Sequence, residues 1–200
     1  GMCGRYLVDE KSLEMRAILE EVARRYEGQG ALPLRTGEIR PSQVAPVQTQ
    51  AGWSVMKWGF DRWDRKGLII NARAETLGQK PMFKKSLAQY RCLVPVSGYY
   101  EWTQDKQKIL FEGQGQSVLY LAGLYRPAQQ ADQVDAYVVI TRDAAQVDPR
   151  FAKIHDRMPA VLRREDRLGW LQADGEAAGY LSCDIPPLSY AAVAHAGSNS

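Results

Sequence analysis

The residue with the most chemical potential is Cys3, which directly follows Met2 near the start of the 200-residue chain. Initiator methionines are commonly removed when the next side chain is small, and Gly1 is interpreted as the remnant of a removed expression tag. We therefore expect a mature protein that begins with Cys3 and carries an α-amine beside a thiol. These two groups ordinarily titrate near pH ~8 and ~8.5. Together they can condense with an aldehyde to an imine and then close a thiazolidine ring.

Two alternatives for this cysteine stay open. The thiol can act as a hydrolase nucleophile that uses its own α-amine as the base. A cysteine near a chain terminus can also have no chemical role, because termini are usually mobile.

Composition narrows the class of protein. The chain is 45% apolar and 24% charged, which suffices for one domain with a substantial core and excludes a disordered chain. The 26 basic and 23 acidic residues give a net charge of +3, which does not by itself indicate a nucleic acid partner. The longest nearly apolar run, 118–125, is too short to span a bilayer. No signal peptide is visible, so we expect a soluble, cytoplasmic protein that does not bind membranes.

The cysteines and histidines argue against a metal cofactor and against disulfides. Cys3, Cys92 and Cys183 are far apart, and only His155 and His195 could join them. A structural zinc site needs closely paired ligands, and an intracellular chain rarely holds disulfides. We expect no metal site, no disulfide and no organic cofactor.

Hydrophobic periodicity predicts which elements position these residues. A helix is expected over 11–26, with Ser12 as its N-cap and Gly28 as its stop. An edge strand is expected over the proline-containing segment 41–49. A strand over 91–102 should bend at Pro95 and Gly98. Further strands are expected over 54–60, 109–111, 118–125 and 136–141, and further helices over 164–172 and 176–181. Strands dominate the middle and their spacings favour hairpins, so the predicted fold is α+β, mainly antiparallel, with one domain over 2–195.

Four segments, taken in order, resemble the SRAP family of SOS-response-associated peptidases, or abasic-site-processing proteins. They run from residue 2 to about residue 162, which is roughly four-fifths of the chain. Each is a weak signal alone, but four in family order are specific. The segments are Met2-Cys3-Gly4-Arg5-Tyr6; Trp58-Gly59 with Asn71-Ala72-Arg73-Ala74-Glu75-Thr76; 91–102 (RCLVPVSGYYEW); and Thr141 with Ile154-His155-Asp156-Arg157-Met158-Pro159.

The resemblance implies a fold and a function. The family fold is a single α+β domain built on a strongly bent, barrel-like antiparallel β-sheet flanked by helices. The implied function is to sense abasic sites in single-stranded DNA by covalent attachment of the N-terminal cysteine to the ring-opened sugar aldehyde. The partner would be single-stranded DNA that contains abasic sites, bound by a monomer that associates with the nucleoid at damage. The family's older name reflects a proposed autoproteolytic activity, which would class the protein as a hydrolase.

The resemblance also implies a role for four catalytic residues. Cys3 supplies the amine for imine formation and the thiolate for ring closure, and Asn71 positions the amine or the sugar. Glu101 donates and accepts the protons that open the sugar ring, if burial raises its pKa. His155 protonates the sugar oxygen or assists the imine step. The structural alternatives are a solvated Glu101, a His155 satisfied by Asp156, and an Asn71 that caps a helix.

Five residues are expected to bind DNA. Arg5, Arg73 and Arg157 carry planar guanidinium groups that suit phosphate oxygens. Trp58 and Trp102 could stack on bases beside the lesion, although core packing is an equally strong expectation for Trp58. Binding should be salt-sensitive and nearly independent of sequence.

Two departures from the family pattern and two rival functions remain. The segment 60–70 and the tail after Ser189 are short, which puts a DNA-groove loop and a partner-binding extension in doubt.

One rival function is that of a cysteine or N-terminal-nucleophile peptidase that acts on peptides. The other is a non-catalytic single-stranded DNA-binding protein.

Overall fold

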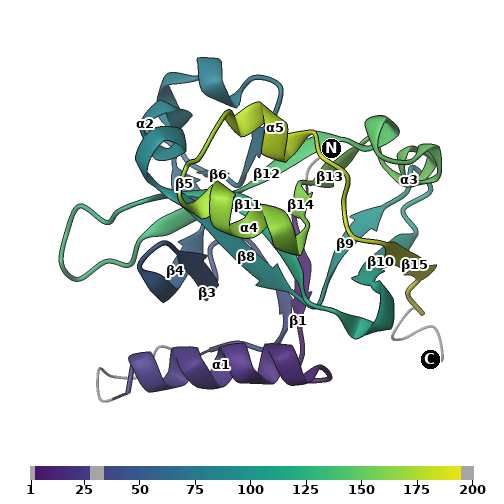
Figure 1. The fold of residues 1–200 in the computed structure, drawn as a ribbon, viewed down its shortest axis with the longest axis horizontal. Coiled ribbons are helices and arrows are strands. Elements are labelled where there is room, and N and C mark those ends of the chain that lie inside the picture. Colours follow the sequence, from purple (N-terminus) through teal and green to yellow (C-terminus); the bar gives the residue numbers. More distant parts are fainter. Residues whose placement is uncertain (1–2, 28–33, 195–200) are drawn as a thin grey trace.

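A closed ring of strands forms the centre of the molecule (Figure 1). The computed structural model describes residues 3–27 and 34–194. An eight-stranded sheet has the order β13-β12-β4-β3-β8-β11-β14, with β7 also paired to β12. Because β12 pairs with β4 on one side and with β11 on the other, the sheet closes on itself as a barrel. Its strands are β3 (Val44–Thr49), β4 (Gly52–Trp58), β7 (Asn71–Arg73), β8 (Arg91–Val96), β11 (Leu119–Arg126), β12 (Ala136–Asp143), β13 (Arg157–Pro159) and β14 (Val161–Leu162).

A second, five-stranded sheet lies beside the barrel. Its order is β15-β10-β9-β1-β2, and every pair in it is antiparallel. These strands are β1 (Tyr6–Val8), β2 (Gly37–Ile39), β9 (Gly98–Trp102), β10 (Lys108–Gly113) and β15 (Leu188–Ala192). A short hairpin joins β5 (Phe60–Asp61) to β6 (Leu68–Ile69). The first residues of the chain therefore lead into a strand that is hydrogen-bonded to β9.

Helices cover the outside of the sheets. They are α1 (Leu13–Arg25), α2 (Pro81–Gln89), α3 (Pro149–Ile154), α4 (Arg164–Leu171) and α5 (Ala177–Leu181), with short 3₁₀ turns η1 (Leu77–Gln79), η2 (Gln114–Gln116) and η3 (Ala144–Gln146). In α1 the Ser12 hydroxyl accepts a hydrogen bond from the Met15 amide (3.0 Å), which confirms the predicted N-cap. Its buried face repeats at helical spacing. The predicted stop, Gly28, lies outside the described residues.

The segment 91–102 divides between the two sheets. It reads as one bent strand in sequence, but β8 belongs to the barrel and β9 to the second sheet, with Ser97 between them. Gly98 lies where the chain enters the second sheet and allows β9 to approach β10 closely, since a Cβ there would lie 2.6 Å from the Phe111 carbonyl oxygen. Pro95 does not interrupt β8, which is buried throughout. The division carries the chain from the core of the barrel to Glu101.

Two further expectations require correction. The segment 41–49 is not an edge strand, because β3 lies inside the barrel between β4 and β8. Pro46, which has no N–H to donate, sits opposite Val55 of β4. The sheet is mainly antiparallel as predicted, but β12 pairs in parallel with β4 and β7. The parallel pairing of β7 is what brings Asn71 beside the middle of β12.

Candidate active site

Cys3 is anchored at the start of the described chain by Asn71. The cysteine is fully buried, and its backbone carbonyl accepts a hydrogen bond from the Asn71 amide nitrogen (3.2 Å). The same nitrogen lies 3.1 Å from the Ile70 carbonyl oxygen and 3.3 Å from that of Val139. Because β7 is held in register on β12, with Asn71 opposite Val139, the amide has a fixed position. The Asn71 side chain thus ties the N-terminal segment to the barrel.

Glu101 is a buried carboxyl in the second sheet. It lies on β9 and is 2% exposed. Burial is the main cause that raises the pKa of Glu101 to about 8, and the negative charge of Asp156 makes a smaller contribution in the same direction. Its Oε1 atom is buried and has no hydrogen-bond partner among the described residues. At neutral pH this side chain is therefore mostly a neutral acid with an unused oxygen, an arrangement suited to proton donation.

His155 faces Glu101 from the end of α3. The imidazole Nε2 lies 3.7 Å from Glu101 Oε2, which is beyond hydrogen-bonding distance but within reach of a small movement. The other ring nitrogen, Nδ1, accepts a hydrogen bond from the Arg157 backbone N–H (3.1 Å). Asp156 Oδ1 lies 3.4 Å from Nδ1, but its side chain is mostly exposed. The backbone contact therefore orients the ring so that Nε2 points toward the carboxyl.

The thiol of Cys3 belongs to the same electrostatic environment. Burial raises the pKa of the Cys3 thiol well above its usual range, and the charge of Glu101 raises it further. At neutral pH the sulfur is thus a neutral thiol that needs a base before it can attack. The structure brings together all four predicted catalytic residues, namely Cys3, Asn71, Glu101 and His155. Among the described residues no group of three His, Cys, Asp or Glu could hold a metal ion.

Comparison with known proteins identifies the family of this chain. The sequence profile of the SOS response associated peptidase (SRAP) family matches residues 2–193. The chain belongs to the SRAP family.

Relatives of this SRAP chain carry names that agree with one another. The "Abasic site processing protein YobE" of Bacillus subtilis is 33% identical over 207 residues, which cover 93% of this chain and 89% of the relative. The "Abasic site processing protein YedK" of Escherichia coli is 25% identical over 182 residues, covering 86% of this chain and 81% of the relative. A crystal structure of a Bacteroides thetaiotaomicron protein superposes with a TM-score of 0.76 at 22% identity, covering 96% of this chain and 92% of the other. That structure supports the SRAP fold, a single domain with a strongly curled sheet and helices around it.

The predicted DNA-binding residues of the SRAP chain lie in different environments. Arg73 is an exposed arginine, 65% accessible at its side chain, with Glu75 at 3.9 Å. The guanidinium of Arg5 lies over the Trp102 ring, 5.1 Å from its centroid, and pairs with Glu38 (3.3 Å). Arg73 is therefore the more available of these two arginines for a phosphate contact.

Arg157 is committed to contacts within the protein. Its side chain is 8% exposed and its two terminal nitrogens donate to the two carboxylate oxygens of Glu75 (3.0 and 2.8 Å). One of them also lies 3.2 Å from Thr141 Oγ1. A direct phosphate contact from Arg157 would require this pair to open.

Trp58 is a core residue, and the expectation that it stacks on a base is wrong. It is fully buried, its indole N–H donates to the Ile70 carbonyl (3.0 Å), and its ring packs against Tyr6 and Tyr137. No face of the ring can reach a nucleobase. Sequence alone left core packing and stacking equally open at this position.

Trp63 is the exposed aromatic that the sequence analysis missed. It lies between β5 and β6, on the hairpin that leads into Asn71, and is 92% exposed. Its neighbours in the chain include Arg62, Arg65 and Lys66. An aromatic among basic residues in a short polar loop was the available signal, because such a side chain has no core to enter.

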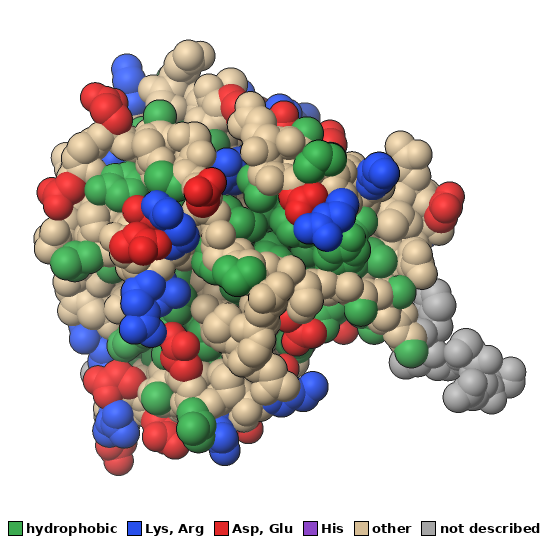
Figure 2. All heavy atoms as spheres, turned by 45° about the vertical axis from the view of Figure 1, so that its right-hand side comes forward, with side chains coloured by type: hydrophobic (Ala, Val, Ile, Leu, Met, Phe, Trp, Pro, Cys, Tyr) green, Lys and Arg blue, Asp and Glu red, His purple; other side chains and the backbone are tan. Residues whose placement is uncertain are grey.

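The surface carries charge of both signs. Figure 2 shows Lys and Arg side chains interspersed with Asp and Glu on the face it displays, around a hollowed apolar region. Any attraction for DNA on this face therefore depends on individual residues and not on a broad basic field. No helix within residues 3–27 and 34–194 has the length and apolar character to cross a membrane.

Proposed function

We propose that this protein captures abasic sites in DNA by forming a covalent bond between Cys3 and the ring-opened sugar. The names of its relatives, abasic site processing proteins, support a role at this lesion. The observation that carries the proposal is Glu101, a buried carboxyl with a pKa of about 8 and an unpaired oxygen, in the environment of the Cys3 thiol. A neutral acid at that place can open the sugar ring.

Ring opening is the first step. An abasic deoxyribose exists mostly as a closed hemiacetal, which holds no free aldehyde. Glu101 donates its proton to the ring oxygen as the bond between that oxygen and C1′ breaks, and the anomeric hydroxyl returns a proton to the carboxylate. The products are a C1′ aldehyde, a C4′ hydroxyl and a regenerated acid.

Capture by Cys3 follows in two bond-forming steps. The α-amine adds to C1′ and the resulting carbinolamine loses water to give an imine. The thiol then adds across the carbon–nitrogen double bond, so that sulfur bonds to C1′ and the thiol proton passes to nitrogen. His155 holds and returns protons in both steps, because its Nε2 faces the carboxyl while its Nδ1 is held by the backbone. Asn71 holds the Cys3 carbonyl so that amine and sulfur approach the same carbon.

This chemistry requires that Cys3 be the first residue. In the sequence Gly1 and Met2 precede it, and an amine within a peptide bond cannot form an imine. Removal of those residues, by a processing enzyme or by the protein itself, is part of the proposal. A peptidase activity limited to this terminus would make self-cleavage a preparation for capture.

Contacts to single-stranded DNA are proposed to come from exposed and partly exposed residues around the site. Arg73 follows Asn71 by two positions and offers a phosphate partner. Trp63 offers a stacking surface for a base beside the lesion. The guanidinium of Arg5 stacks on Trp102, at the end of β9, and the two side chains together can contact the DNA. A missing base lowers the cost of unstacking the target nucleotide, which favours lesions over intact DNA.

A denaturing gel tests the proposal. Protein that begins at Cys3 is mixed with a single-stranded oligonucleotide carrying one abasic site, and a heat-resistant shifted band is expected. Cys3→Ala, or retention of Gly1-Met2, should abolish the band, whereas Cys183→Ala, which removes a cysteine outside the site, should leave it unchanged. A band of equal intensity with Cys3→Ala would refute covalent capture by Cys3. Turnover of a peptide substrate without any band would favour the peptidase.

A further inference from the structure

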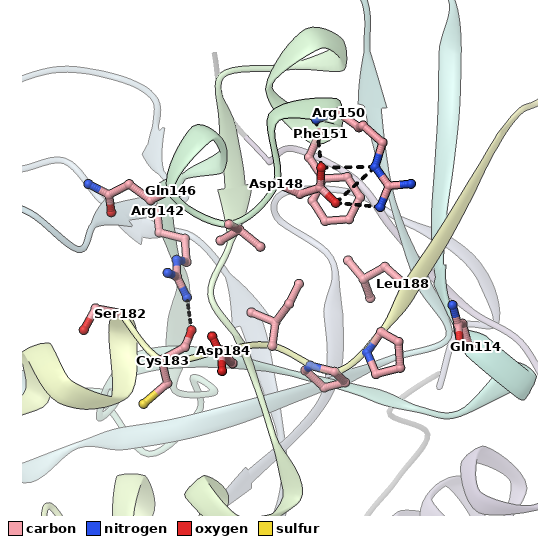
Figure 3. Close-up of a pocket in the computed structure, with 14 residues that line it drawn as sticks. Gln114, Arg142, Gln146, Asp148, Arg150, Phe151, Ser182, Cys183, Asp184 and Leu188 are labelled. Carbon is pink, nitrogen blue, oxygen red and sulfur yellow. Dashed lines mark hydrogen bonds and ion pairs between the residues drawn. The ribbon is translucent and has the colours of Figure 1, made fainter.

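A separate cavity lies between α3, η3 and the segment 182–188 that follows α5 (Figure 3). Its volume is about 450 Å³, which is in the range of small-molecule sites. None of the four candidate catalytic residues lines it. Figure 3 shows Arg142 at one end of the cavity, between Gln146 and Cys183, with Leu188 and Gln114 at the other end.

Arg142 is the unusual side chain of this cavity. It lies near the end of β12 and is 4% exposed. Its Nη1 donates to the Cys183 carbonyl (2.7 Å), and its Nε has no hydrogen-bond partner among the described residues. Burial lowers the pKa of Arg142, which reflects the cost of keeping its charge away from water. None of the ion pairs within the described chain includes it.

The other charged groups at the cavity form no direct ion pair with this cation. Arg150 and Asp148 neutralise each other through a close pair (2.8 Å). Two carboxylates act on Arg142 only from beyond ion-pair distance. They are Glu75, which pairs with Arg157, and Asp184, an exposed residue on the segment that follows α5. By contrast the other deeply buried guanidinium next to this strand, that of Arg157, is matched by Glu75. A buried charge without a partner is costly, so an anion that entered here would be stabilised.

We propose that this cavity binds a phosphate group, with Arg142 at one end as its main cation and Gln146 at the rim. The planar guanidinium suits two phosphate oxygens at once. The volume exceeds that of a single ion, so the rest of a phosphorylated compound can follow the group into the cavity. The phosphate can belong to the DNA strand itself or to a small phosphorylated molecule.

The cavity is connected to the candidate active site through one short helix. Phe151 of α3 lines the cavity, and its carbonyl oxygen accepts the backbone N–H of His155, the residue that caps α3 (3.0 Å). A phosphate held at Arg142 would therefore lie against the helix that ends at His155. The binding site itself does not depend on Cys3.

Inorganic phosphate is the probe for the first test. It is titrated by calorimetry at constant ionic strength, with chloride as the balancing anion, and saturable binding is expected. Gln146→Glu adds a negative charge at an exposed rim position and should weaken binding about fivefold or more, whereas Asp184→Asn removes one and should tighten it. Gln104→Glu, at an exposed turn between β9 and β10, is the matched control and should change nothing. Cys3→Ala should bind phosphate as the parent does.

The results that overturn the proposal are specific. Absence of phosphate binding beyond that of chloride would refute it, as would equal affinity in the parent, Gln146→Glu and Arg142→Gln proteins. If Arg142→Gln fails to fold, the opposite shifts of Gln146→Glu and Asp184→Asn still decide. A second arm identifies the source by measuring binding of an intact single-stranded oligonucleotide. If phosphate competes with the oligonucleotide and Gln146→Glu weakens oligonucleotide binding, the cavity binds a phosphate of the DNA strand. If neither changes oligonucleotide binding, the cavity binds a small phosphorylated molecule.

Discussion

The imidazole Nε2 of His155 lies 3.7 Å from Oε2 of Glu101, while the second carboxyl oxygen of Glu101 has no hydrogen-bond partner among the described residues. The two side chains come from different parts of the fold, β9 and the end of α3. One oxygen thus faces a group that can exchange protons, and the other remains available to a ligand. With its two oxygens placed in this way, the carboxyl can donate a proton to a ligand and then be reprotonated.

The first prediction concerns the pH dependence of covalent capture. The α-amine must be unprotonated, so the rate should rise toward pH ~8. Glu101 must be protonated, and since its pKa is about 8 the rate should fall again above that value. Rates of adduct formation measured across this range should give a bell-shaped profile.

Glu101→Gln separates the two limbs of that profile. The variant should slow capture by ~10²-fold or more and lose the alkaline limb, because no acid remains to be deprotonated. Glu112→Gln, on the neighbouring strand β10, is the control and should keep the full profile. An alkaline limb that persisted in Glu101→Gln would assign it to another group.

The second prediction concerns stability. The pKa of Glu101 is raised to about 8 in the folded protein and is near ~4.3 when unfolded. Between these values the folded state binds more protons than the unfolded state, so the free energy of unfolding decreases as pH rises and levels off above about 8. Denaturant unfolding should show a loss of about 2–4 kcal/mol between pH ~5 and ~8.5 that Glu101→Gln abolishes. A parent and variant with parallel pH dependence would contradict the raised pKa.

The third prediction concerns Asn71. Asn71→Ala removes the donor that holds the Cys3, Ile70 and Val139 carbonyl oxygens. We expect a loss of about 1–3 kcal/mol in stability and a lower yield of adduct. Ser97→Ala is the matched control, because it also removes a side-chain hydrogen bond, to the Asp9 amide (2.9 Å), without touching the site. Equal adduct yields in the two variants would reduce Asn71 to a structural role.

The sequence was sufficient to predict those features that depend on a local signal. Ser12 followed by an apolar repeat specified the start of α1, and the motif residues identified Cys3, Asn71, Glu101 and His155 as one group. Their geometry was not predictable, because it depends on the parallel pairing of β7 with β12 and on the backbone contact at His155 Nδ1. Both are long-range or conformational features that no window of sequence contains.

The errors have an equally physical origin. Proline disfavours central strands, which led to the edge assignment of 41–49, but barrel closure places β3 between two partners. In 91–102 the sequence predicted the interruption at Gly98, but it could not show that the residues after it join another sheet. Topology overrode local preference in both segments.

The fourth prediction compares two arginines. Arg73→Ala should weaken binding of an intact single-stranded oligonucleotide and lower the slope of log affinity against log salt by about 1, since an exposed cation is lost from a phosphate contact. Arg5→Ala should have a smaller effect on that slope, because Glu38 and the Trp102 ring already engage this guanidinium. Fluorescence anisotropy at several salt concentrations measures both. A larger change for Arg5 would reverse the assignment.

The last prediction contrasts the two tryptophans of the neighbouring segments β4 and the β5–β6 hairpin. Trp58 is fully buried and hydrogen-bonded to Ile70, so Trp58→Ala should lower the free energy of unfolding by about 3–5 kcal/mol. Trp63 is 92% exposed, so Trp63→Ala should leave stability within about 0.5 kcal/mol and weaken DNA binding by about 1–3 kcal/mol. Trp58→Phe keeps most of the buried volume and should fold well enough for its DNA affinity to be compared with the parent. If Trp58→Phe weakened DNA binding and Trp63→Ala did not, the stacking surface would have to lie elsewhere, because a ring enclosed by Tyr6 and Tyr137 reaches a base only when the core opens.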